Sequence, residues 1–351
     1  MAMIAAAQPQ ATWLERQHDF GVILERDGKA SCTMRVVNTG SEPLLIIKAQ
    51  AGCGCTGISY PESPIEPGDT ARVSISYNPS GRPGEFNKQV MIQTNTEPRR
   101  TILEISGNVI PTDATLDKRY PLRAGDLRVS QGFIPFGDIE KGAHKMLYLS
   151  AYNASTDTLL VTVDGSKPHL RPTVIPDTVP PAQLATLMAH YYAAYAPLWG
   201  LNTDTLTLSC RPLHNNAAQS SSVGIEVLAQ VTERFDHLTD KERASAPRVG
   251  LDCDDRIDFG IMARGETATR TFTITNKGKG TLAVRRVWVP DGEGVTVSCD
   301  RSELKRGKTA RVTVTVNTGL VQGNLLNVPL TLMCNDPDKP RQVIRLVGII
   351  D

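Results

Sequence analysis

The chain contains one sequence pattern that is written three times. Each copy opens on Phe-Gly, continues to an asparagine at a turn, and carries a small residue close to its end. The repeat is roughly 90 to 120 residues long, which exceeds the about 20 to 50 residues of a solenoid unit and matches a whole domain. We therefore expect three related domains, at residues 12–111, 118–235 and 249–351. The matching positions are Phe20-Gly21, Phe136-Gly137 and Phe259-Gly260, then Asn38, Asn153 and Asn276, then Gly107, Ala229 and Gly348.

The charge balance excludes several classes of partner. The chain has 38 Lys and Arg residues against 37 Asp and Glu residues, a formal net charge of +1, and 5% aromatic residues. Nucleic-acid binding needs a basic surface and, for single strands, aromatic platforms, so we expect no nucleic-acid partner. No apolar run approaches the roughly 18 residues of a membrane span, so we expect no membrane insertion.

The first and third copies alternate polar and apolar residues in short segments. Residues 71–77 alternate strictly, and residues 88–93 and 101–106 follow with a turn between them. Residues 43–47, Pro-Leu-Leu-Ile-Ile, indicate a buried strand. About seven such strands in a copy, rich in valine and threonine, are typical of a sandwich. The predicted fold class is all-β, with three tandem immunoglobulin-like antiparallel β-sandwich domains.

The middle copy contains a segment that supports two interpretations. Residues 181–195 have the composition of a helix, with a proline near the first turn. On the repeat, however, Pro180-Pro181 align with Pro67-Gly68, and residues 185–191 align with the strand predicted at 71–77. We favour the strand, because a register shared by three copies outweighs a local propensity, but the helix remains an alternative.

Two segments are predicted to be linkers between domains. The first begins at residues 111–114, before a lead-in at residues 122–129 that starts the second domain. The second spans residues 233–248, which are charged and poorly periodic. Neither linker is long or rich in glycine, so the three domains are expected to form a semi-rigid rod.

The sharpest local feature is the double-cysteine loop, Cys53-Gly54-Cys55, in the first copy. Its two cysteines could form a strained, labile disulfide with each other, or offer two thiolates to a soft metal. Alternatively, one of them could pair with Cys32 while the other stays free. A structural disulfide in a surface loop is the plainest interpretation, and a reactive attachment or oligomerisation thiol is a further one. The third copy has no cysteine at the matching stretch, so the fold does not require the loop.

The remaining cysteines and the histidines give weaker signals. Cys210 and Cys334 sit at equivalent strand ends and are expected to be buried small hydrophobes, while Cys253, Cys299 and Cys334 could give one bridge. No two histidines have ligand spacing, and the phosphate-binding, dinucleotide-binding and serine-nucleophile motifs are missing. We therefore expect no catalytic residues, no metal site, no cofactor and no small-molecule ligand.

Several of these features occur together in one known family. The residues that carry the likeness are Phe20-Gly21, residues 38–40 and 43–44, the double-cysteine loop, Pro67-Gly68 and the turn at 94–98. Together they resemble the DUF1573 domain, an uncharacterised immunoglobulin-like module of exported Bacteroidetes proteins that is similar to the ASH, MSP and PapD-like sandwiches. The likeness covers about residues 18–110; the third copy keeps the framework without the two cysteines, and the second keeps little of it. The resemblance implies a fold and an exported location, and it transfers no catalytic residues.

The leading hypothesis is a non-enzymatic exported scaffold, adhesion or protein-interaction protein of the bacterial cell envelope. It would work in the periplasm or at the cell surface and bind a protein partner through sandwich edges and loops. The alanines at residues 5–7 have the small-residue pattern of a signal-peptidase site, although a charged region and a long apolar region are missing. One alternative is a redox-active or metal-handling protein that uses Cys53 and Cys55, and another is a cytoplasmic ASH-like scaffold.

Overall fold

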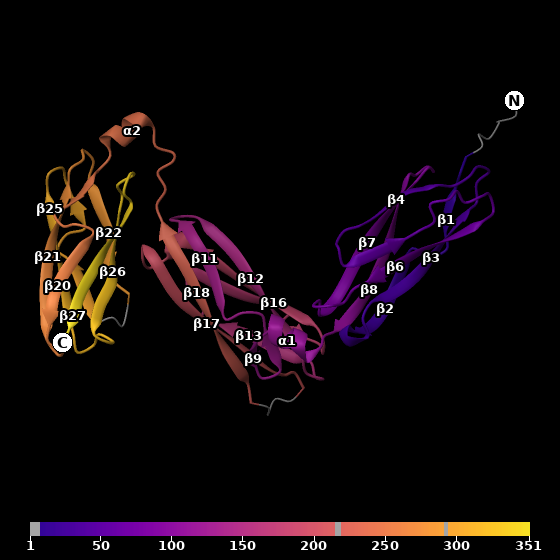
Figure 1. Ribbon diagram of the computed structural model, residues 1–351, viewed down its shortest axis with the longest axis horizontal. Helices are drawn as coiled ribbons and strands as arrows, with labels where there is room; N and C mark the ends of the chain where they lie inside the picture. The colour runs from indigo at the N-terminus through magenta and orange to yellow at the C-terminus, as the bar shows by residue number, and fades with distance from the viewer. Residues whose placement is uncertain (1–7, 215–218, 291–293) are drawn as a thin grey trace.

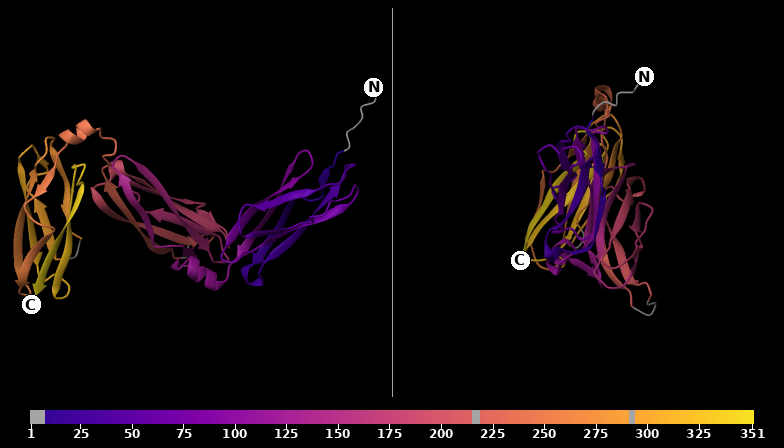
Figure 2. Two further views of the ribbon diagram at one scale, coloured as in Figure 1. Left: turned by 45° about the horizontal axis from the view of Figure 1, so that its top comes forward. Right: turned by 90° about the vertical axis from the view of Figure 1, so that its right-hand side faces the viewer.

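Three β-sandwiches follow one another along the chain, each with its own hydrophobic core. The computed structural model describes residues 8–214, 219–290 and 294–351, so the alanines at residues 5–7 lie outside the described residues. The sandwiches are arranged in a zigzag, with the N-terminal and C-terminal domains at opposite ends (Figure 1; Figure 2). The prediction of an all-β fold of tandem sandwiches is confirmed.

Domain 1 packs two four-stranded sheets against each other. Its elements are β1 (Ala11–Trp13), β2 (Gln17–Leu24), η1 (Glu25–Asp27), β3 (Ala30–Asn38), β4 (Ile46–Ala51), β5 (Thr56–Ser59), β6 (Thr70–Tyr77), β7 (Gly84–Thr94) and β8 (Arg100–Ile110). The strand orders are β1-β3-β6-β5 and β2-β8-β7-β4. Tyr77 and Phe86, one from each sheet, stack in the core with ring centroids 3.8 Å apart.

Domain 2 packs two five-stranded sheets. Its strands are β9 (Leu122–Ala124), β10 (Leu127–Val129), β11 (Phe133–Glu140), β12 (His144–Asn153), β13 (Leu159–Asp164), β14 (Leu170–Ile175), β15 (Thr178–Val179), β16 (Leu184–Tyr192), β17 (Gly200–Pro212) and β18 (Ser221–Thr232), with η2 (Ala193–Tyr195) after β16. The strand orders are β14-β16-β12-β10-β9 and β11-β18-β17-β13-β15.

Domain 3 repeats the plan with a four-stranded and a five-stranded sheet. Its strands are β19 (Val249–Leu251), β20 (Arg256–Met262), β21 (Thr267–Asn276), β22 (Leu282–Trp288), β23 (Val295–Cys299), β24 (Glu303–Leu304), β25 (Thr309–Asn317), β26 (Leu325–Cys334) and β27 (Arg341–Ile350). The strand orders are β19-β21-β25-β23 and β20-β27-β26-β22-β24.

The Phe-Gly pair that opens each copy forms a β-bulge on an edge strand. In each domain this strand (β2, β11 or β20) pairs parallel with the last strand (β8, β18 or β27), the exception in otherwise antiparallel sandwiches. The bulge places Gly21, Gly137 and Gly260 at φ of 63°, 63° and 73°, where a residue without a Cβ is favoured. In domains 1 and 3 the carboxylates of Asp19 and Asp258 accept the glycine N–H at 2.9 and 2.8 Å.

The repeated asparagine ties loops to the strand that precedes them. Asn38 is fully buried, and its Nδ2 donates to the carbonyls of Glu42 and Ile65, each at 2.8 Å. Asn153 and Asn276 make the equivalent pairs of bonds in their own domains. A buried amide that satisfies two carbonyls stabilises the fold, so the repeat is a signature of this architecture.

The ambiguous segment of the middle copy is a strand. β16 pairs with β12 and β14 in the register that the repeat predicted, with Ala185 opposite Ala151. The predicted alignment of Pro180-Pro181 with Pro67-Gly68 is wrong by one residue. The equivalent pair is Pro181-Ala182, because the N–H groups of Ala182 and Gly68 donate to the carbonyls of Asn153 and Asn38, respectively.

The predicted buried strand at residues 43–47 is also corrected. Leu44 and Ile46 are buried, whereas Leu45 and Ile47 are 37% and 56% exposed. The segment leads into β4, an edge strand of its sheet, so it alternates between core and solvent instead of being buried throughout.

Both predicted linkers contain a short helix that the sequence interpretation missed. α1 (Asp113–Arg119) begins at the N-cap Thr112, and α2 (Asp240–Ser245) begins at Thr239, which forms a capping box with Glu242. The arrangement is bent at both linkers and is not a straight rod (Figure 1).

Candidate functional site

The double-cysteine loop lies between β4 and β5 of domain 1. Cys53 and Cys55 form a disulfide with a Cα–Cα distance of 5.3 Å, and Cys55 is buried. Cys32, on β3, is a free and half-buried cysteine, so a bridge from Cys32 to this loop does not describe the structure. The hydroxyl of Thr56 lies 3.7 Å from the sulfur of Cys53. The disulfide therefore closes within the loop and does not link it covalently to another strand.

The remaining cysteines are all free. Cys210 and Cys334 are buried, as predicted, whereas the suggested bridge among Cys253, Cys299 and Cys334 is wrong. Burial raises the thiol pKa of each free cysteine, and it raises the pKa of Cys334 to about 11. A thiol with a raised pKa has little thiolate at neutral pH and is a poor nucleophile or ligand.

Strand pairing brings together histidines that are distant in the sequence. His144 on β12 and His190 on β16 lie with their ring nitrogens 3.0 Å apart, and the ring of His144 also stacks on Tyr192. Inside domain 2, the ring of His169 hydrogen-bonds the buried carboxylate of Asp204 at 2.9 Å. Sequence spacing could not reveal either pair, because each depends on which strands are neighbours. Across the described ranges, no three His, Cys, Asp or Glu side chains group as metal ligands would.

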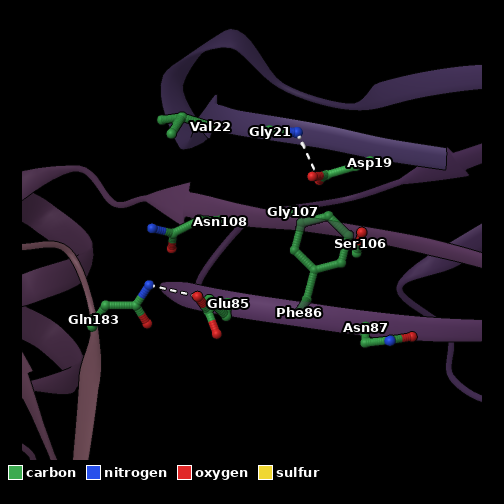
Figure 3. A pocket seen from close by; sticks show the side chains of 10 residues that line it. All are labelled: Asp19, Gly21, Val22, Glu85, Phe86, Asn87, Ser106, Gly107, Asn108 and Gln183. Atoms are coloured by element: carbon green, nitrogen blue, oxygen red, sulfur yellow. Dashed lines mark hydrogen bonds between the residues drawn. The ribbon is translucent and has the colours of Figure 1, made fainter. Parts of the chain in front are cut away.

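The junction of domains 1 and 2 forms an open groove of about 560 Å³ (Figure 3). β2, β7 and β8 supply one wall, and Gln183 of domain 2 closes one end by donating to Glu85 over 2.7 Å. Asn108 points into the groove, and its Oδ1 is buried without a hydrogen-bond partner in the structure. The groove is thus lined by polar side chains and by the backbone of Gly21 and Gly107. Its lining is Asp19, Gly21, Val22, Glu85, Phe86, Asn87, Ser106, Gly107, Asn108 and Gln183.

Glu25 holds this junction in one geometry. Its carboxylate accepts the N–H of Gly81 at 2.7 Å, the N–H of Thr112 at 2.8 Å and the hydroxyl of Thr115 at 2.7 Å. Partial burial would raise the pKa of Glu25, but these hydrogen bonds hold it below its ordinary value. On its other side, α1 packs Leu116 against domain 2 in a small separate cluster. The linker helix is therefore fixed to both domains.

The junction of domains 2 and 3 is held by two arginines of β22. Arg285 on β22 forms two hydrogen bonds with Glu233, at 3.1 and 3.0 Å, and its guanidinium lies 4.8 Å from the ring centroid of Trp199. The neighbouring Arg286 donates to the carbonyls of Trp199 and Leu201. A cavity of about 140 Å³ remains between the two domains. Charge pairing and cation–π contact thus fix the second junction.

The helices of the structure are short. Across the residues that it describes, none is long and apolar enough to cross a membrane.

Two family models match the chain. Residues 11–109 match the protein of unknown function family DUF1573, which confirms the resemblance seen in the sequence. Residues 249–348 match the HYDIN/CFA65/VesB-like, Ig-like domain. Each match covers one domain and less than half of the chain. A search of curated proteins found no match.

Solved structures share parts of the fold at low identity. A protein of unknown function from Porphyromonas gingivalis W83 is 19% identical, with a TM-score of 0.49, over 64% of this chain and 100% of that chain. The ASH/PapD-like domain 7 of human CEP192 is 12% identical, with a TM-score of 0.28, over 33% and 93%. An endo-fucoidan hydrolase of glycoside hydrolase family 107 is 11% identical, with a TM-score of 0.27, over 98% and 44%. These values carry no argument about function.

Proposed function

We propose that the protein is a non-enzymatic interaction scaffold that presents the groove of the first junction to a polypeptide partner. The observation that carries the proposal is a groove built by two domains whose linker is fixed by Glu25. A preorganised site loses less entropy on binding than a flexible one. β2 borders the groove and is the edge strand of its sheet, so an extended segment of the partner can hydrogen-bond to its free side.

The proposed compartment is the cell envelope, in the periplasm or at the cell surface. The Cys53–Cys55 disulfide supports this location, because disulfides persist in oxidising compartments and are rare in the cytosol. Cell fractionation with thiol trapping tests it. Recovery of the protein in the envelope fraction with Cys53 and Cys55 oxidised is expected, and recovery in the cytosol would favour the ASH-like cytoplasmic alternative.

Quantitative capture from envelope extracts tests the binding function. Val22 lines the groove and is 66% exposed, so Val22→Asp should leave the fold intact and reduce capture of the partner at least tenfold. Tyr148→Asp, at a 69% exposed position on domain 2, is the matched control and should capture as much as the wild type. Equal capture by both variants would contradict the assignment of the groove.

The second candidate function is thiol redox chemistry at Cys53 and Cys55. It is favoured by their pairing with each other while the other cysteines remain free. The reduced pair would give two electrons and two protons to a partner disulfide and close its own. An insulin-reduction assay with dithiothreitol as reductant tests this role. Turnover that is lost in the Cys53→Ser/Cys55→Ser variant would replace the scaffold proposal.

A further inference from the structure

Each domain has a row of three side chains at the same place in its fold. The row starts at the residue after the bulge glycine on the edge strand and continues across the two neighbouring strands. In domain 1 it consists of Val22, Asn108 and Glu85, which are directly cross-strand partners. The equivalent rows are Asp138, Gln230 and Leu201 in domain 2, and Ile261, Ile349 and Leu325 in domain 3.

The rows of domains 1 and 2 lie against the next domain along the chain. In domain 1, Glu85 accepts a hydrogen bond from Gln183 of domain 2. In domain 2, the carbonyl of Leu201 accepts a hydrogen bond from Arg286 of domain 3, and Asp138 and Gln230 line the cavity between the domains. In domains 1 and 2, the row therefore lies at the junction with the next domain.

The row of domain 3, here called the terminal row, has a different character. Ile261, Ile349 and Leu325 are 74%, 51% and 69% exposed. Three adjacent aliphatic side chains on the outer face of a sheet form an apolar patch of the kind that marks an interaction site. Each of the first two rows has two polar residues and one aliphatic residue, Val22 or Leu201, whereas the third row is aliphatic at every position.

The surface of domain 3 that contacts domain 2 has an equivalent in domain 1, where Ile47 and Lys48 take the positions of Arg285 and Arg286. Arg285, which contacts domain 2, is the extra residue of a bulge between β22 and β26. Ile47 is the extra residue of the same bulge between β4 and β7. Two asparagines fix this equivalence. Asn95 accepts the N–H of Leu45, two positions before Ile47. Asn335 accepts the N–H of Ala283, two positions before Arg285.

The position equivalent to Arg285 is thus apolar and free in domain 1. Ile47 is 56% exposed, Leu45 just before β4 is 37% exposed, and Ile102 on β8 of the same sheet is 45% exposed. We call these three residues the β4 face. The terminal row and the β4 face belong to domains at opposite ends of the molecule (Figure 1).

We propose that the terminal row of one molecule docks onto the β4 face of a second copy. Domain 1 of the second copy would then contact domain 3 of the first, in the way that domain 3 contacts domain 2 within one chain. This contact is heterologous and joins copies end to end. It concerns copies of this chain and does not rest on the partner proposed above.

The change from polar to apolar residues has a physical reason. Inside the chain, the linker gives the next domain a high effective concentration, so polar contacts are sufficient to dock it. Two separate molecules lose translational and rotational freedom when they associate, and apolar burial has to offset that loss. The aliphatic residues of the terminal row and of the β4 face provide apolar surface that such an association would bury.

Sedimentation velocity of the full chain at increasing concentration tests the proposal. We expect the weight-average mass of the wild type to rise above the monomer between about 5 and 500 µM, as a small interface of this kind predicts. Ile349→Asp and Ile47→Asp should each remain monomeric over this range. A 1:1 mixture of the two variants should form a dimer and nothing larger, because one variant keeps the terminal row and the other keeps the β4 face.

Tyr148→Asp is the control and should associate like the wild type, since it lies on domain 2 away from both surfaces. A wild type that stays monomeric at the highest concentration would overturn the proposal. So would association of Ile47→Asp alone, which would indicate a symmetric contact between two terminal rows. If circular dichroism shows that an Asp variant is unfolded, Ile349→Asn and Ile47→Asn replace the pair with the same expected outcomes.

Discussion

The backbone N–H of Gly68 donates to the carbonyl of Asn38 over 2.8 Å, and Gly68 makes this contact at φ of 85°. Gly307 occupies the same turn position in domain 3, at φ of 73°. In domain 2 the position is held by Ala182, at φ of 60°. The turn before β6, β16 and β25 thus requires a residue with a left-handed backbone conformation. Domains 1 and 3 have glycine at this position.

The first prediction concerns Gly68→Ala. A Cβ at this position meets no atom within 4 Å, so the cost is the left-handed backbone alone, about 1 kcal/mol of domain 1 stability. Gly52→Ala is the control, since Gly52 has equally open space and no left-handed φ. Hydrogen exchange read by mass spectrometry resolves the opening free energy of domain 1. Equal effects of the two substitutions would contradict the account of the turn.

The second prediction concerns the buried asparagine. Asn38→Ala removes the side-chain donor of the Glu42 carbonyl and the acceptor of the Gly40 N–H, while the Ile65 carbonyl keeps the N–H of Leu44. A buried unsatisfied group costs about 1 to 3 kcal/mol. We expect domain 1 to lose about 2 to 4 kcal/mol of stability in denaturant unfolding. Asn87→Ala, at an exposed position on β7, should change stability by less than about 0.5 kcal/mol. A loss below about 1 kcal/mol for Asn38→Ala would show that water replaces the amide.

The sequence predicts the sandwiches well because the patterns that indicate their strands and turns lie within short segments. Alternation along β6 and β25, and glycine where φ is positive, can be seen in a single strand or turn. The strand at β16 was recognised only by comparing copies, since its own composition favours a helix. The alignment with the other two copies therefore predicted a strand that the segment alone would not have predicted.

The junctions could not be predicted, because they depend on residues far apart in the chain. Glu25 binds Thr112 and Thr115, which lie 87 and 90 positions later in the chain. The second linker helix, α2, did leave a local trace. Thr239 and Glu242 have the spacing of a capping box, which predicts a helix start even in a charged segment of poor periodicity.

The third prediction is a pH dependence of domain 2. Burial of Asp204 raises its pKa, but hydrogen bonds from Lys167 and His169 outweigh this and leave the pKa below its ordinary value of 3.8. A carboxylate with a depressed pKa adds stability at higher pH and loses it as pH falls through the depressed value. Domain 2 should therefore lose stability from about pH 4 downward. Asp204→Asn should flatten this dependence in unfolding followed between pH 7 and 2, and an unchanged slope would assign it to other carboxylates.

The fourth prediction concerns alkylation of the cysteines. Burial raises the pKa of the free thiols, so iodoacetamide at pH 7.5 should modify them slowly, and Cys334 slowest of all. Mild reduction should release two further thiols at Cys53 and Cys55. Peptide mass spectrometry identifies each site. Rapid labelling of both residues before reduction would show that the disulfide is absent from the protein in solution.

The last prediction concerns the elbow between domains 1 and 2. Glu25→Ala removes the acceptor of three hydrogen bonds from Gly81, Thr112 and Thr115. α1 then contacts domain 1 through the hydrogen bond from Arg119 to the carbonyl of Gly81, and it keeps the Asp117–Arg128 ion pair and its apolar contact with domain 2. The angle between the domains should become variable, while each core stays folded. Spin labels at exposed sites on the two domains should show a distance distribution at least twice as broad as in the wild type.

Glu15→Ala is the matched control for the elbow. Glu15 also pairs with a neighbouring group, Arg35, but both residues lie within domain 1. Its removal should leave the interdomain distances unchanged. A narrow distance distribution in Glu25→Ala would contradict this prediction. It would mean that the packing of Leu116 and Gly84 against domain 2 determines the angle between the domains without the hydrogen bonds of Glu25.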